Sequence, residues 1–256
     1  MRRRVAVAFL GVGLAASVAA GQQVAHYRAS GHDASLLEQY DGDGYSLQVA
    51  ADSDGSLDLT VRVSDAPLAS EAPFPTRTGP DPKLPAAPDR DAFARRAVEG
   101  SQTQAEAVRR VLLAVASEVR YDPDHTRRQD PAAVFASRRA YCVGLSELAV
   151  DLLRRVGITA RSVQGILRTE PDNPAWDAAI GGAYHRWIEV YYPDRGFVFS
   201  DPARSINGVN ARYIPFASRA LVRPKELEVR MTSIEGELKY DPIKAGDATL
   251  RVRAAR

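Results

Sequence analysis

The fold of this chain is decided by residues 141–157, which read YCVGLSELAVDLLRRVG. After Cys142, apolar side chains recur at intervals of three and four residues. This spacing predicts an amphipathic helix with Gly157 as its C′ residue. Cys142 therefore lies in or just before the first turn, on the same inward stripe as Leu145. A helix N-terminus favours the thiolate over the thiol, so this position suits a reactive cysteine.

Cys142 is the only cysteine among 256 residues. The chain therefore cannot form an internal disulfide, and its stability has to come from a hydrophobic core. Taken alone, a single cysteine is more often a small buried hydrophobic residue than a nucleophile. The catalytic interpretation depends on finding a base and a group that orients the base.

Two strands are predicted after the helix, over residues 183–192 and 197–201, with turn residues between them. His185 lies on the first strand, and Asp201 ends the second. They share a face only if the loop is odd in length or carries a one-residue bulge, for which Gly196 is a suitable αL residue. A plain four-residue loop would put them on opposite faces. We expect the bulge, which gives Cys142, His185 and Asp201 the roles of nucleophile, base and orienting acid.

Three blocks of sequence together resemble the transglutaminase-like superfamily, over roughly residues 105–210. They are the Tyr141–Val163 block that begins with the cysteine, the strand His185-Arg186-Trp187-Ile188-Glu189-Val190, and Phe199-Ser200-Asp201-Pro202. The resemblance implies an α+β fold with a papain-like core, in which the nucleophile helix packs on an antiparallel sheet. It also implies a catalytic triad of Cys142, His185 and Asp201 that needs no metal or organic cofactor.

Two features depart from the common pattern of that family. Members often have glycine one or two residues before the cysteine, where this chain has Ala140 and Tyr141. Cross-linking members place a tryptophan upstream, near the oxyanion, whereas Trp176 and Trp187 both follow Cys142. The backbone N–H of Cys142 is then the one oxyanion donor that can be named from sequence. These departures argue against protein cross-linking.

The sequence therefore predicts a thiol-dependent acyl-transfer enzyme that acts on amide bonds of a peptide, a protein or a cell-envelope component, with hydrolysis favoured. Two alternatives stay open. The chain could be a catalytically silent module whose cleft binds an envelope peptide or protein. It could also resemble arylamine acetyltransferases, whose triad has the same residue types and whose reaction requires acetyl-CoA.

Residues 1–20 have the pattern of a signal peptide. The cationic start MRRR precedes an apolar run of 16 residues that ends in small side chains. This run is shorter than the roughly 20 residues that span a bilayer. We expect cleavage near Gly21, export to the periplasm or the medium, and membrane contact only through the signal. Cleavage changes the formal net charge from +2 to −1, which gives no indication of nucleic-acid binding.

The whole chain is predicted to contain a signal peptide (1–20), a small β-rich region (21–66), a proline-rich linker (67–90), a transglutaminase-like domain (91–215) and a C-terminal β extension (216–256). Within these regions we expect β-hairpins over 45–63 and 226–240. A helix should begin near Ser101, with a capping box made by Ser101 and Gln104. A shorter helix over 131–136 should be capped by Asp130.

Overall fold

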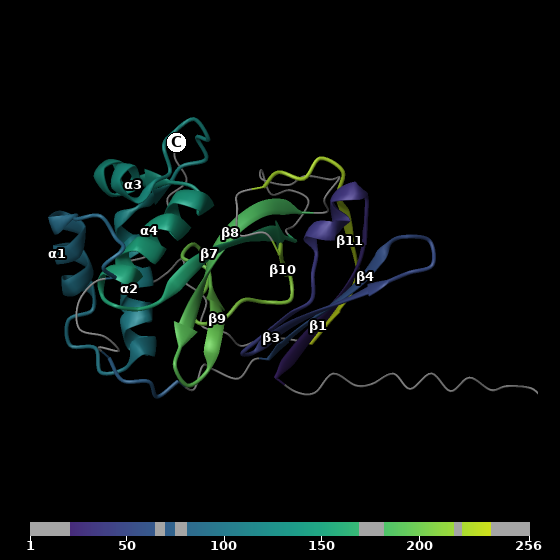
Figure 1. Ribbon diagram of the computed structural model, residues 1–256, viewed down its shortest axis with the longest axis horizontal. Coiled ribbons are helices and arrows are strands. Elements are labelled where there is room, and N and C mark those ends of the chain that lie inside the picture. Colours follow the sequence, from purple (N-terminus) through teal and green to yellow (C-terminus); the bar gives the residue numbers. More distant parts are fainter. Residues whose placement is uncertain (1–20, 65–69, 75–80, 169–181, 218–221, 237–256) are drawn as a thin grey trace, which may run out of the picture.

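The computed structural model describes residues 21–64, 70–74, 81–168, 182–217 and 222–236. These residues form three layers (Figure 1): four α-helices, a central four-stranded sheet and an outer five-stranded sheet. The predicted α+β class is confirmed, and the helix that begins at Cys142 packs on the central antiparallel sheet.

The outer sheet is antiparallel and has the strand order β11-β1-β4-β3-β2. Its strands are β1 (Gln22–Ser30), β2 (Tyr40–Gly42), β3 (Tyr45–Ala51), β4 (Leu57–Ser64) and β11 (Glu228–Glu235). A short 3₁₀ helix, His32–Leu36, follows β1. Strands β3 and β4 form the hairpin predicted over 45–63. Because β11 pairs with β1, the first and last described strands lie side by side.

The predicted hairpin over 226–240 differs from the structure. Strand β11 continues to Glu235, through residues that we expected to form a turn. Its partner β1 supplies hydrogen bonds along this length, which favours extension over turning. The expected second strand, residues 236–240, lies almost entirely outside the described residues.

The central sheet has the order β10-β7-β8-β9 and is also antiparallel. Its strands are β7 (Ala160–Leu167), β8 (Ala183–Tyr192), β9 (Gly196–Ser200) and β10 (Tyr213–Pro215). A separate parallel pair, β5 (Arg120–Tyr121) and β6 (Arg139–Ala140), leads the chain to the nucleophile helix.

The β8–β9 hairpin has the register that we expected. Tyr192 pairs with Gly196, which leaves a loop of three residues, 193–195. Gly196 has a φ of +75°, in the left-handed region that glycine tolerates. Since Ile188 pairs with Ser200, the same register would place the next residue, Asp201, opposite Trp187. Asp201 therefore falls on the same side of the hairpin as His185, because residues two apart on a strand share a face.

The helices are α1 (Pro88–Ala97), α2 (Gln104–Glu118), α3 (Pro131–Ser137) and α4 (Cys142–Arg155). Helix α4 begins at Cys142, and Gly157 follows it with a φ of +81°, as predicted. Asp130 caps α3 by accepting a hydrogen bond from the N–H of Ala133.

The predicted start of α2 was wrong. Its N-cap is Thr103, whose hydroxyl accepts from the N–H of Glu106, and the Glu106 carboxylate accepts from the N–H of Gln102. A carboxylate also interacts more favourably than an amide with the positive end of the helix dipole. Ser101 is buried, and its hydroxyl has no hydrogen-bond partner in the described part of the chain.

The proline-rich linker predicted over 67–90 is partly packed. Ala72 is buried, its carbonyl accepts from the N–H of Gln104, and Phe74 packs against the helical core. Pro88 is the first residue of α1, which begins inside the predicted linker because proline is well tolerated at the first helical position.

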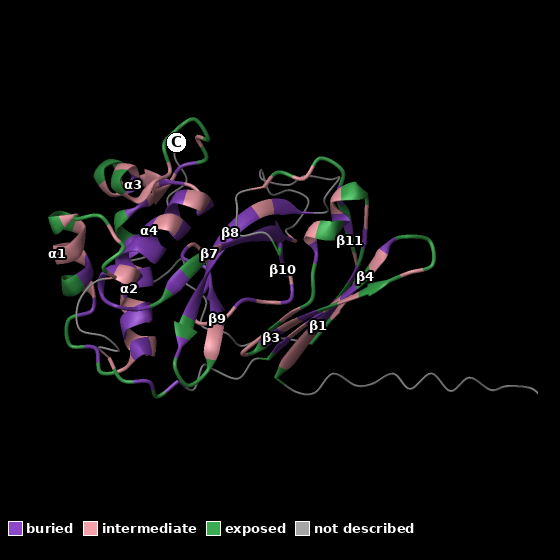
Figure 2. Ribbon diagram, in the orientation of Figure 1, coloured by how far each residue is buried: buried purple, intermediate pink, exposed green. Residues whose placement is uncertain are grey.

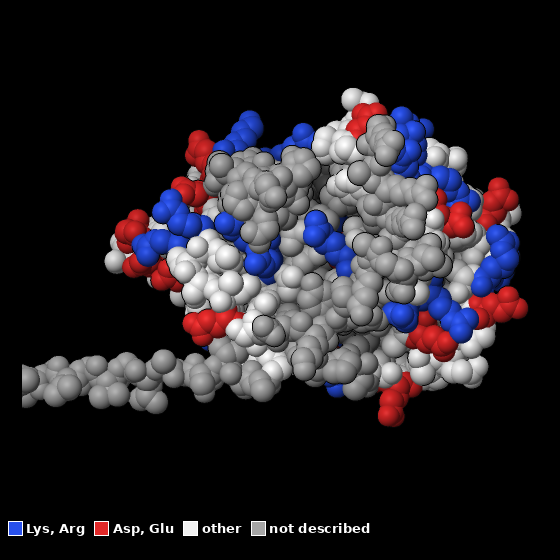
Figure 3. All heavy atoms as spheres, turned by 180° about the vertical axis from the view of Figure 1, so that it is seen from behind, with Lys and Arg blue, Asp and Glu red and all other residues white. Residues whose placement is uncertain are grey.

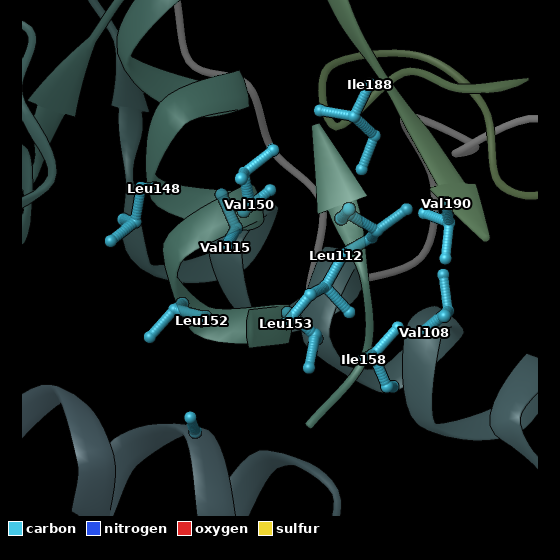
Figure 4. Packing of buried hydrophobic residues seen from close by; sticks show 14 of the residues in the cluster. Val108, Leu112, Val115, Leu148, Val150, Leu152, Leu153, Ile158, Ile188 and Val190 are labelled. Atoms are coloured by element: carbon cyan, nitrogen blue, oxygen red, sulfur yellow. The ribbon is translucent and has the colours of Figure 1, made fainter. Parts of the chain in front are cut away.

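Two hydrophobic clusters hold the layers together. The first lies between the helices and the central sheet, and Figure 4 shows members contributed by α2 (Leu112), α4 (Leu153) and β8 (Val190). The second lies between the two sheets and includes Trp187 and Leu59. Helix α4 is buried along most of its length (Figure 2), so the position of Cys142 is fixed by the core.

Charged side chains are unevenly spread over the face in Figure 3, where Lys and Arg reach the middle and Asp and Glu lie toward the outline. None of the described helices is long and apolar enough to cross a membrane.

Candidate active site

The first turn of α4 is held by the segment that precedes it. Tyr141 is the extended N-cap, and its N–H donates to Oε1 of Gln129 at 3.2 Å. Gly144 lies directly against the side chains of Gln129 and Ala140, where a Cβ atom would collide. These contacts place Cys142 at the N-terminus of a 14-residue helix. The N–H groups of residues 142–144 precede the first helical hydrogen bond, from Leu145 to Tyr141.

A contact between α4 and β8 brings the cysteine to the histidine. The hydroxyl of Ser146 donates to the carbonyl of Arg186 at 3.0 Å, which holds the first turns of α4 against the strand that carries His185. Cys142 raises the pKa of His185, so the two side chains lie close to each other. Both residues are buried.

Asp201 is fully buried and binds the imidazole of His185. Its Oδ2 lies 2.6 Å from Nε2 of His185 and accepts from the hydroxyl of Tyr213 at 2.7 Å. Its Oδ1 accepts from the N–H of Ala203 at 2.9 Å. Three partners thus satisfy a carboxylate that has no access to water, and Nδ1 of His185 remains available to Cys142.

Burial disfavours the charged form of His185, but the charge of Asp201 and hydrogen bonds with Asp201 and Cys142 outweigh it. The pKa of His185 is therefore raised above its ordinary value. Burial likewise opposes ionisation of Asp201, yet His185 and the donors Tyr213 and Ala203 lower its pKa. The two residues form an imidazolium–carboxylate pair at neutral pH.

Aromatic side chains surround the histidine. The ring of Trp187 stacks at 6.1 Å from that of His185, and the ring of Tyr213 lies 5.9 Å away, edge-on. Trp187 is fully buried. Together they exclude water from the side of the imidazole that binds Asp201, which strengthens the hydrogen bond between His185 and Asp201.

The structure brings together all three residues predicted from the sequence. It adds Tyr213 and Gln129, which no motif in the sequence indicates. Tyr213 reaches Asp201 because β10 pairs with β7, and no spacing in the sequence indicates that pairing. Gln129 lies in a loop 12 residues before Tyr141, without a motif of its own. Trp176 lies outside the described residues.

A thiol at a helix N-terminus, an imidazole beside it and a buried carboxylate behind the imidazole are the elements of a nucleophile–base–acid triad. A family model described as the transglutaminase-like superfamily matches residues 91–202. This region belongs to the transglutaminase-like superfamily. The match includes α4, β8, β9 and Asp201, so the transglutaminase-like region contains every residue of the candidate triad.

Other comparisons concern shorter or more distant similarities. The uncharacterized protein YebA of Bacillus subtilis (strain 168) is 32% identical over 77 residues, which make up 28% of this chain and 10% of YebA. A proposed cysteine protease from Cytophaga hutchinsonii superposes with a TM-score of 0.44 at 11% identity, covering 84% of this chain and 87% of the other. The periplasmic domain of TgpA from Pseudomonas aeruginosa, bound to ethylmercury, gives a TM-score of 0.38 at 16% identity, covering 70% and 89%.

Proposed function

We propose that this chain is an exported thiol-dependent acyl-transfer enzyme that acts on amide bonds, and that hydrolysis is its main reaction. The observation that carries the proposal is the 2.6 Å hydrogen bond between buried Asp201 and His185, with Cys142 close enough to the imidazole to raise its pKa. A buried cysteine with only a structural role would not need a fully buried acid to hold its neighbouring histidine.

In the proposed reaction, the Cys142 thiolate attacks the amide carbonyl carbon and forms a tetrahedral oxyanion. The N–H of Cys142, free of helical hydrogen bonds, would donate to that oxygen. The His185 imidazolium gives its proton to the leaving amine as the C–N bond breaks, which leaves a thioester on Cys142. His185 then removes a proton from water, and the attack of that water on the thioester releases the acid and regenerates the Cys142 thiolate beside the His185 imidazolium.

Asp201 acts through His185. Its hydrogen bond to Nε2 keeps Nδ1 directed at Cys142, and its charge stabilises the imidazolium. Hydrolysis is favoured because the chain has no tryptophan before Cys142. Cross-linking members of the transglutaminase-like superfamily have a tryptophan in that part of the sequence. The signal-like residues 1–20 support export, and an envelope peptide or protein is the proposed substrate.

The test is acylation by p-nitrophenyl acetate with the purified protein. We expect a burst of p-nitrophenol equal to the enzyme concentration, followed by turnover, and neither in Cys142→Ser, whose hydroxyl is a far weaker nucleophile. With methylamine added, acetate should remain the main product if hydrolysis is preferred, whereas N-methylacetamide would indicate transamidation.

Other outcomes would support the alternatives. A folded wild-type protein without a burst would favour the binding module. Acetylation of Cys142 by acetyl-CoA, with transfer to an arylamine, would indicate the acetyltransferase.

A further inference from the structure

Arginines elsewhere in the molecule are mostly matched by acids. Arg155 contacts both Asp151 and Asp91, Arg154 contacts Asp81, and each of these ion pairs is 2.6–2.7 Å long. The arginines beside the candidate triad differ from this pattern. Their charge is only partly compensated, and they come from three separate segments of the chain.

Arg186 follows His185 on β8, and its side chain is 10% exposed. Its Nη2 binds Glu147 of α4 at 2.7 Å, but Nε and Nη1 have no hydrogen-bond partner among the described residues. Leaving two guanidinium nitrogens unsatisfied in a buried position carries a free-energy cost. A ligand with an acceptor oxygen would remove that cost.

Arg204 lies in the tight turn that follows Asp201. The N–H of Arg204 donates to the Asp201 carbonyl, and Ser205 pairs with Asp201 by two backbone hydrogen bonds. The turn therefore holds Arg204 next to the orienting acid. Its side chain is exposed and has no acidic partner in the part of the chain that the structure describes.

Arg223 is exposed in segment 222–224, which lies across β7 and β8. Gln164 exchanges two hydrogen bonds of 2.7 Å with the backbone of Val222, and the hydroxyl of Tyr184 donates to Pro224 at 2.9 Å. Gln164 pairs directly with Arg186 in the sheet, so Arg186 and segment 222–224 share a face. Within the described residues, Arg223 also lacks an acidic partner.

The charges of these side chains reach the residues around Cys142. Burial raises the pKa of Tyr141, the residue before the cysteine, whereas Arg223 and Arg186 lower it. Burial raises the pKa of Tyr121, which flanks Ala140, to about 12 despite the opposing effect of Arg204. The free N–H groups at the start of α4 add partial positive charge at the same place.

We propose that Arg186, Arg204 and Arg223, with the N-terminus of α4, form an anion-binding rim around Cys142 that selects substrates carrying a carboxylate close to the scissile amide. This inference rests on the proposed function, because it assigns the substrate class of the same site. Arg186 contributes a buried guanidinium charge with two unsatisfied nitrogens, and the two exposed arginines attract the carboxylate by charge.

The test compares two alkylating reagents that differ in charge: anionic iodoacetate and neutral iodoacetamide. Both react with Cys142 by the same displacement of iodide, so the ratio of their rates reports the local potential independently of thiol reactivity. We expect Arg204→Gln/Arg223→Gln to lower the iodoacetate-to-iodoacetamide ratio by about three-fold or more at low ionic strength, and the difference to shrink in 1 M salt. Arg96→Gln, an exposed arginine on α1, is the matched control and should leave the ratio unchanged.

The Arg186→Gln ratio should fall as well. This variant also breaks the ion pair between Arg186 and Glu147. The double variant of the exposed residues Arg204 and Arg223 therefore gives the deciding measurement. The anion-binding rim would be overturned if the double variant had the same ratio as wild type and Arg96→Gln. In that case, labelling by iodoacetamide that depends on His185 would still support the proposed function. Failure of both reagents to label folded wild-type protein would contradict both proposals.

Discussion

At the scale of single residues, Asp201 is the group on which the site depends. It is fully buried, yet it keeps a lowered pKa because His185, Tyr213 and Ala203 all bind its carboxylate. The sequence predicted the partnership of His185 and Asp201 from their positions on a hairpin. The bond from Tyr213 could not be predicted, because β7 separates its strand, β10, from the β8–β9 hairpin.

Replacing Asp201 with asparagine should keep the shape of the site and remove its negative charge. The corresponding change in a serine-protease triad costs about 10⁴ in rate, and we expect a loss on the order of 10² here, because a preformed thiolate needs less help from its base. The charge of Asp201 raises the pKa of His185, so its removal lowers that pKa. Activity needs the imidazolium. As the pH rises, this variant should therefore lose activity at a lower pH than the wild-type protein. Wild-type rate and pH profile in this variant would exclude Asp201 from the triad.

Tyr213→Phe should remove one donor to the Asp201 carboxylate and lower the free energy of unfolding by about 2 kcal/mol, as expected for a buried bond to a charged group. It should also slow the alkylation of Cys142, through weaker orientation of His185. Tyr27→Phe is the matched control, because its buried hydroxyl donates to the Ala211 carbonyl and does not contact the triad. Equal alkylation rates in both variants would show that Tyr213 has only a structural role.

At the scale of elements, α4 and the β8–β9 hairpin were predicted closely because their signals are local. The apolar stripe and Gly157 bound the helix, and Gly196 permits the odd loop that sets the register. The neighbour of β7 was not predictable. Strand β10 has only three residues, and its place next to β7 depends on the close approach that Gly165 allows.

Gly165→Ala should disturb the site from a distance. Its Cβ would collide with the Ile214 carbonyl of β10 and lie 2.6 Å from the Trp187 ring. We expect a loss of about 3 kcal/mol in stability, because this core cannot relax around the added atom. Alkylation of Cys142 should also become slower, because a shift of β10 displaces Tyr213 from Asp201. Thermal unfolding compared with Gly208→Ala, where a Cβ meets nothing within 4 Å, provides the control. Equal stability of the two variants would contradict this packing.

At the scale of the whole molecule, the outer sheet packs against the transglutaminase-like region. The sequence predicted β-rich ends but not that β11 would pair with β1. That pairing joins residues about 200 apart in the chain, and local patterns carry no information about such contacts. Arg204 and Arg223, which lack acidic partners among the described residues, could not be identified from the sequence either, because ion pairing depends on the fold.

Export should yield a mature protein that begins at or near Gly21. Strand β1 starts at Gln22, in the interior of the outer sheet, so cleavage there removes no strand residue. Intact-mass measurement of material from the periplasm or medium should give the mass without residues 1–20. Recovery of protein that keeps Met1 in the membrane fraction would contradict cleavage.

The central claim is that His185 and Cys142 form a reactive ion pair, and the pH dependence of iodoacetamide labelling tests it most directly. An ordinary thiol titrates near pH 8.5, whereas a thiolate beside an imidazolium reacts at lower pH. We predict that iodoacetamide labels wild-type Cys142 over the pH range in which His185 is protonated, and that His185→Ala shifts the profile toward that of an ordinary thiol. Identical profiles for the two proteins, or a folded wild type that resists labelling at every pH, would contradict the account.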